Sequence, residues 1–187
     1  MTTPNTASTF PVHTQDSAPD GSRAALDALE QRVGFIPNLA ATMAGAPVLI
    51  NGFGALQQAL RATTLTGLER EVVGLTVSHE NASRYSMAAH SVFAAGQGAG
   101  EHLVAALRQG KPPADPRLRA LHEFTLALLR ERGRVAPERM AALRAAGYTE
   151  EQLFEVIAQA GYTSIANWVA NLCDTPVDEA FLAQRWS

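Results

Sequence analysis

The chain has 187 residues, a hydrophobic share of 47% and a formal net charge of −3. This length is enough for one domain with a substantial core. The weak acidic charge and the absence of like-charge runs exclude the basic surface that nucleic-acid binding requires.

The N-terminus and the single cysteine indicate the cellular compartment of the protein. No apolar run approaches the roughly 20 residues that cross a bilayer, and the polar start lacks the basic and apolar parts of a secretory signal. Cys173 is the only cysteine, so an intrachain disulfide is impossible. We therefore expect a cytoplasmic protein that does not bind membranes.

Residues 1–19 are rich in Thr, Pro, Ser and Asp, which favours an extended arm. We expect this arm to dock through Phe10 and Val12. Residues 20–187 then form one helical domain.

Helical spacing of apolar residues continues through the rest of the chain, broken by Gly and Pro. Two capping boxes, Thr66 with Glu69 and Thr149 with Gln152, mark helix starts. The expected helices span residues 22–33, 37–44, 47–62, 67–79, 83–95, 101–109, 116–132, 137–146, 149–172 and 177–186. Alternating strand patterns are missing, so the predicted fold class is all-α, an irregular multi-helix bundle.

The chemistry of the chain is concentrated between residues 69 and 90. Ser83, Ser86 and His90 are spaced by three and four residues, which places them on one face of a helix. Glu71 flanks the apolar stripe of the preceding helix, where a carboxylate must find a partner or shift its pKa. Two hydroxyls, an imidazole and an acid are therefore expected to meet at one site.

The residues that carry a family resemblance are Glu-Arg-Glu-Val-Val at 69–73 and Tyr-Ser-Met-Ala-Ala-His-Ser at 85–91. With further segments along most of the chain, at 10–12, 34–39, 145–149 and 175–181, they resemble the alkylhydroperoxidase D-like and carboxymuconolactone decarboxylase superfamily. The peroxidase-related branch is the more similar one. The resemblance implies the fold of that superfamily, a homo-oligomer with sites near subunit contacts, and no cofactor, because side chains carry the chemistry.

In peroxidase members the motif is Glu, then Cys-x-x-Cys, then His four residues after the second cysteine. Glu71 and His90 match, while the cysteine positions hold Ser83 and Ser86; Tyr85, between the two serines, completes the expected site. The resemblance implies that the second cysteine attacks a hydroperoxide and the first resolves it to a disulfide, which a thiol reductant reopens. Glu and His would relay the proton.

The two serines change what the site can do. A hydroxyl is far less acidic than a thiol, and oxygen forms no sulfenic acid or disulfide. Cys173 lies in a distant helix without a resolving partner. We therefore predict that this chain does not turn over peroxide by the thiol route, whether Ser83 and Ser86 are native or introduced.

Three alternatives stay open. An acid–base enzyme acting on a lactone acid, like the decarboxylase members, would use Glu71 and His90 with the nearby His79, and Arg70 or Arg84 would hold the carboxylate. A serine hydrolase would need His90 to contact Ser86, but the sequence shows no nucleophile elbow.

The third alternative is a non-catalytic binding or assembly module. In that case Ser83 is an N-cap, Ser86 a small packing residue, Tyr85 and His90 packed side chains, and Glu71 a buried acid paired with an arginine. The histidines of the chain lack mutual metal-ligand spacing, so we expect no metal.

Overall fold

The computed structural model describes residues 10–186, and these contain helices and no strand. The helices are α1 Asp20–Val33, α2 Asn38–Met43, α3 Pro47–Ala59, η1 Leu60–Ala62, α4 Gly67–Glu80, α5 Arg84–Gly96, α6 Glu101–Arg108, α7 Pro116–Arg130, α8 Pro137–Ala145, α9 Glu150–Leu172 and η2 Glu179–Gln184. None of the described helices is long and apolar enough to cross a membrane.

The predicted all-α class is confirmed, and so are both capping boxes, in which side chain and backbone bond reciprocally at Thr66–Glu69 and Thr149–Gln152. Most of the boundaries differ from the expectation by one or two residues. The first helix, for example, begins at Asp20, and the long helix α7 ends at Arg130. The last expected helical piece is a 3₁₀ helix, Glu179–Gln184.

The N-terminal arm lies only partly within the described residues, since residues 1–9 are outside them. The backbone of the arm contacts two helices: the N–H of His13 donates to the Ala41 carbonyl at 3.2 Å, and the carbonyls of Asp16 and Ala18 accept hydrogen bonds from Arg23. The expected docking residues, Phe10 and Val12, are 47% and 41% exposed. The imidazole of His13 also packs over Gly45.

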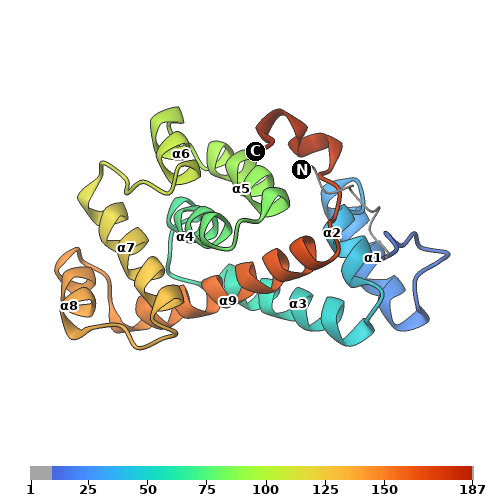
Figure 1. Cartoon of the computed structure of the whole chain (residues 1–187). Helices are drawn as coiled ribbons and strands as arrows, with labels where there is room; N and C mark the ends of the chain where they lie inside the picture. Colours follow the sequence, from blue (N-terminus) through green and yellow to red (C-terminus); the bar gives the residue numbers. More distant parts are fainter. Residues whose placement is uncertain (1–9, 187) are drawn as a thin grey trace, which may run out of the picture.

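Helix α4 is the centre of the molecule (Figure 1) and packs against α5, α6, α7 and α9. Every residue from Val72 to Ser78 is buried. The sequence predicted a helix with one apolar side. The structure differs because neighbours cover α4 all round, which its small and β-branched residues permit.

Two large apolar cores and a small third one, around Tyr85, Ala170 and Phe181, all include residues of the long helix α9. The first core combines α4 and α7 with the first half of α9, around residues such as Leu75, Leu121 and Val156. The second core combines α1, α2 and α3 with the second half of α9, around Leu26 and Ile50. Helix α9 therefore joins both halves of the bundle, as Figure 1 shows.

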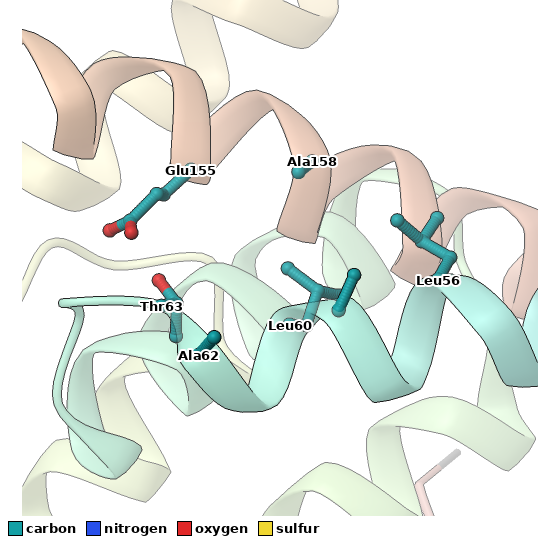
Figure 2. Close-up of a pocket in the computed structure, with 7 residues that line it drawn as sticks. Leu56, Leu60, Ala62, Thr63, Glu155 and Ala158 are labelled. Carbon is teal, nitrogen blue, oxygen red and sulfur yellow. The ribbon is translucent and has the colours of Figure 1, made fainter.

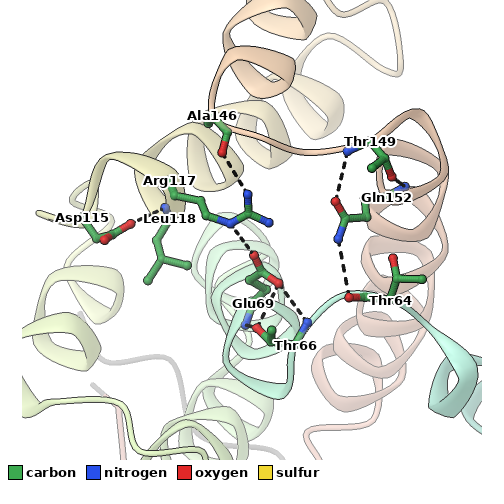
Figure 3. A network of polar contacts seen from close by, with 9 residues as sticks. All are labelled: Thr64, Thr66, Glu69, Asp115, Arg117, Leu118, Ala146, Thr149 and Gln152. Atoms are coloured by element: carbon green, nitrogen blue, oxygen red, sulfur yellow. Dashed lines mark hydrogen bonds and ion pairs between the residues drawn. The ribbon is translucent and has the colours of Figure 1, made fainter.

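A buried carboxylate fixes the start of α4 (Figure 3). Glu69 accepts hydrogen bonds from the backbone N–H and hydroxyl of Thr66, and it pairs with Arg117 Nε at 3.0 Å. Arg117 also donates to the Ala146 carbonyl and lies over the ring of Tyr148. The network joins α4 to α7 and to the α8–α9 loop, and Glu69 stands two residues before Glu71 in α4.

Candidate active site

A tight junction between α4 and α5 sets the geometry of the site. The N–H of Ser83 donates to the Ser78 carbonyl, and the N–H of Ala82 donates to the His79 carbonyl. This pair of bonds is a Schellman motif, with Ala82 at the left-handed position (φ 49°) where glycine is usual. Ser83 therefore follows directly on the end of α4 and takes the N-cap position of α5.

Glu71 and His90 form the central contact. The carboxylate oxygen Oε2 of Glu71 lies 2.7 Å from Nδ1 of His90, and the two side chains are only 16% and 11% exposed. The contact orients the imidazole and leaves Nε2 as the nitrogen available to another group. The expected meeting of the acid and the imidazole is thus present, and the acid is paired with a histidine rather than with an arginine.

The ring of His90 lies against the backbone of α4 at Gly74. A Cβ at that position would be 2.6 Å from two ring atoms of His90, so only glycine leaves space for the imidazole. Gly74 stands one turn after Glu71 on the same helix. Sequence reasoning missed it, although an isolated glycine inside a strong helical pattern was a usable signal.

Ser83 and Ser86 stand on the face of α5 that carries His90. Both side chains are buried, and neither hydroxyl has a hydrogen-bond partner among residues 10–186. Ser83 occupies the N-cap position, but its side chain does not cap the helix, so capping does not explain it. Two buried hydroxyls without partners at the N-terminus of a helix are costly for folding, which is a common property of functional sites.

Tyr85 contacts the C-terminal segment. Its hydroxyl donates to Asp178, which also accepts the N–H of Asn38 at 2.9 Å. Its ring meets Phe181 edge to face. Burial and the Asp178 carboxylate raise the pKa of Tyr85. The structure therefore joins Tyr85 to the C-terminal segment and to α2 through Asp178.

Among residues 10–186, His79 and Ser86 form no hydrogen bond with the pair, and Arg70 is half-buried without a hydrogen-bond partner for its Nε. His79 packs on Trp186 and over Gly110, and eight residues of helix put it roughly 12 Å along the axis from Glu71. The hydroxyl of Ser86 makes no hydrogen bond to His90, so the contact that a serine hydrolase needs is missing. Arg84 is exposed at the start of α5.

Cys173 cannot replace the missing thiols. It is buried at the C-terminal end of α9, and burial raises the pKa of its thiol, which disfavours the reactive thiolate. Among residues 10–186, no group of three His, Cys, Asp or Glu side chains is arranged to hold a metal ion.

Tyr162, in α9, packs against α3. Its ring stacks on Phe53 with centroids 4.2 Å apart, and its hydroxyl accepts a hydrogen bond from Gln57 at 2.8 Å. Burial raises the pKa of Tyr162 to about 12, and the charge of Glu71 acts in the same direction.

Solved structures with this architecture cover nearly the whole chain. A peroxidase-related protein from Ralstonia eutropha JMP134, described as an alkylhydroperoxidase AhpD core, has a TM-score of 0.84 and 25% identity over 96% of this chain and 97% of that chain. A peroxidase-related protein from Silicibacter sp. TM1040 has a TM-score of 0.79 and 21% identity over 98% of both chains.

A third solved structure shows that similar folds have other activities. It is a cysteine-to-alanine variant of the debrominase Bmp8 in complex with 2,3,4-tribromopyrrole, with a TM-score of 0.76 and 22% identity over 98% of this chain and 97% of that chain. No protein-family model and no curated protein matches the sequence.

Proposed function

We propose that this chain, which belongs by its fold to the alkylhydroperoxidase D-like superfamily, has a peroxidase-related site that keeps the proton relay but lacks the redox thiols. The observation that supports the proposal is the 2.7 Å contact between Glu71 and His90, with the unpartnered hydroxyls of Ser83 and Ser86 on the same face of α5. The likeness to peroxidase-related structures agrees with it.

The proton relay would serve a thiol at position 86. A thiolate attacks one oxygen of a hydroperoxide, the O–O bond breaks, and the products are a sulfenic acid and an alcohol. A second thiol at position 83 then condenses with the sulfenic acid, giving a disulfide and water, and a dithiol reductant restores both thiols. Position 86 lies in the first turn of α5, where the helix dipole favours the thiolate.

With serine at both positions the cycle cannot begin, because oxygen has no equivalent oxidation step. The small-molecule substrate that the site inherits is a hydroperoxide, and the partner that it inherits is a thiol reductant. The present chain has no thiol with which to use this substrate and this reductant. We therefore expect it to be inactive as a thiol peroxidase.

The test compares the chain with the double variant Ser83→Cys/Ser86→Cys, using tert-butyl hydroperoxide and dithiothreitol. We expect the unaltered chain to consume no hydroperoxide above the background and the double variant to turn over. Adding Glu71→Gln should slow the double variant by roughly 10²–10⁴-fold, while Glu123→Gln, a change on the surface, should not. Turnover by the unaltered chain, or a double variant that is folded but inactive, would refute the proposal.

A second candidate is an acid–base enzyme without thiols. The Glu71–His90 contact favours it, since an oriented imidazole with a free Nε2 can exchange a proton with a substrate. A panel of lactone acids tests it, with loss of turnover in Glu71→Gln as the criterion. Binding without turnover, seen as a ligand-dependent rise in melting temperature, would instead indicate a binding module.

A further inference from the structure

A pocket of about 430 Å³ opens between α5, α6 and the C-terminal segment. Figure 1 shows α6 and the C-terminal segment beside α5. The apolar walls of the pocket come from Ala95, Val104 and Ala105, and Trp186 lines it from the end of the chain. A volume of this size suits a small organic molecule, since ligand pockets measure about 300–1,000 Å³.

The guanidinium of Arg108 lines the same pocket. Its Nη1 donates to the buried hydroxyl of Ser91 at 2.9 Å and to the Gln184 carbonyl at 2.9 Å, and its Nη2 donates to the Arg185 carbonyl at 2.7 Å. These acceptors are all neutral, and no carboxylate among residues 10–186 forms an ion pair with Arg108. Burial lowers the pKa of Arg108, but an arginine stays charged at neutral pH. The pocket therefore holds a positive charge without a counter-charge.

Two N–H donors of this guanidinium remain for another group. An arginine side chain carries five N–H donors, and within the described part of the chain Arg108 uses three of them. Both donors of Nη1 are engaged, so the remaining two are on Nε and Nη2, which share one edge of the planar group. Such an edge matches the two oxygens of a carboxylate.

The other charge in the pocket limits what the ligand can be. Glu101 lines it from the first turn of α6, seven residues before Arg108, which places the two residues roughly 10 Å apart along the helix. One cation and one anion disfavour a ligand with several negative charges, such as a phosphate ester. The apolar residues Val104 and Ala105 stand between the two charged ones, so the body of the ligand meets an apolar wall.

A smaller hollow between α3 and α9 lacks these features (Figure 2). Its volume is about 180 Å³, and Leu56, Leu60 and Ala158 are among the residues that line it. Glu155 stands at its edge, but its carboxylate accepts hydrogen bonds from the backbone N–H and hydroxyl of Thr64, at 2.8 and 2.9 Å. The residues described along this hollow therefore offer a ligand no unpaired charge.

We propose that the pocket between α5, α6 and Trp186 is a binding site for a small monocarboxylic acid with an apolar body. Nε and Nη2 of Arg108 bind the carboxylate, and the apolar body lies against Val104, Ala105 and the indole of Trp186. The ligand supplies the counter-charge that the protein does not provide. The site shares no residue with the candidate active site, so the proposal does not depend on the proposed function.

The fluorescence of Trp186 reports binding, because this residue lines the pocket. The chain has one other tryptophan, Trp168, and Trp168→Phe removes its signal. In this background, phenylacetate should change the fluorescence with a dissociation constant below about 1 mM. Phenylacetamide, which has the same shape without the charge, should bind at least about 10-fold more weakly. Absence of a saturable change with phenylacetate, or equal binding of the amide, would overturn the proposal.

A matched pair of variants tests where the ligand binds. Ala105 is exposed and lines the pocket three residues before Arg108, so Ala105→Asp and Ala105→Asn add side chains of nearly equal size there. The aspartate repels a carboxylic acid and gives Arg108 an internal counter-charge, whereas the asparagine does neither. Phenylacetate should therefore bind the aspartate variant at least about 10-fold more weakly than the asparagine variant. Circular dichroism checks that both are folded, and equal affinities of the two folded variants would contradict the assignment of the site.

Discussion

The imidazole ring of His90 lies directly on the backbone of Gly74, and the contact leaves no room for a side chain on α4. Gly74→Ala should therefore push the ring away from Glu71 and cost about 1–3 kcal/mol of unfolding free energy, as overpacking in a core does. The same change at Gly54, where an added Cβ would meet nothing within 4 Å, should stabilise α3 slightly. Urea unfolding gives the free energies, and the His90 ring resonances report the displacement.

Replacing Ser86 by alanine should stabilise the protein by about 1 kcal/mol, because it removes a buried hydroxyl without a partner in the described structure. Ser91→Ala is the contrasting control. Its hydroxyl donates to the Met87 carbonyl at 2.7 Å and accepts from Arg108, so its removal should destabilise. Equal effects of the two variants in thermal unfolding would contradict this interpretation of Ser86.

Tyr85→Phe should lower stability without affecting chemistry at the site. The change removes one hydrogen bond to the Asp178 carboxylate, and we expect a loss of about 1–3 kcal/mol. In the background of the cysteine double variant, the rate of hydroperoxide reduction should stay the same. A large loss of rate in a folded Tyr85→Phe protein would instead show that Tyr85 takes part in the reaction.

Glu69 should make stability depend on pH in the acid range. Burial raises the pKa of its carboxyl, but the hydrogen bonds from Thr66 and Arg117 outweigh burial and leave the pKa below its usual value. A lowered pKa in the folded state contributes stability above the unfolded value of about 4.3, and this stability is lost as the pH falls through the folded value. Melting temperatures of the chain and of Glu69→Gln should therefore converge as the pH falls below the folded pKa of Glu69.

Ala82→Gly should stabilise the junction between α4 and α5. Ala82 has φ 49°, a left-handed conformation that costs a non-glycine residue about 1 kcal/mol. Glycine removes this cost but loses more entropy on folding, so we expect a net gain of about 0.5 kcal/mol. Ala82→Val, which adds a branched side chain at the same position, should destabilise; the reverse order in chemical unfolding would contradict the assignment.

Local patterns in the sequence predict most of the helices and the pairing of the two central residues. Capping residues and helix breakers depend on near neighbours, so Thr66, Thr149 and Gly34 mark ends that the structure reproduces. The approach of Glu71 and His90 follows from two helix faces joined by a short turn, together with the family motif.

The parts of the site that sequence could not predict depend on contacts between distant helices. The burial of α4 on all sides needs four neighbours that no local pattern encodes. Consecutive side chains of a helix point about 100° apart around its axis. Tyr85 therefore has different contacts from Ser86, although the two residues are neighbours in the sequence. Its partner Asp178 lies 93 residues away, in a segment for which only a short helix was expected.

The Schellman junction has a consequence for how this scaffold changes its chemistry. Position 83 is held by main-chain bonds from the end of α4, and position 86 follows from the first turn of α5. Neither side chain contributes to the architecture that presents it. The side chains at positions 83 and 86 can therefore be exchanged, by evolution or by mutagenesis, while the backbone that holds them keeps its conformation.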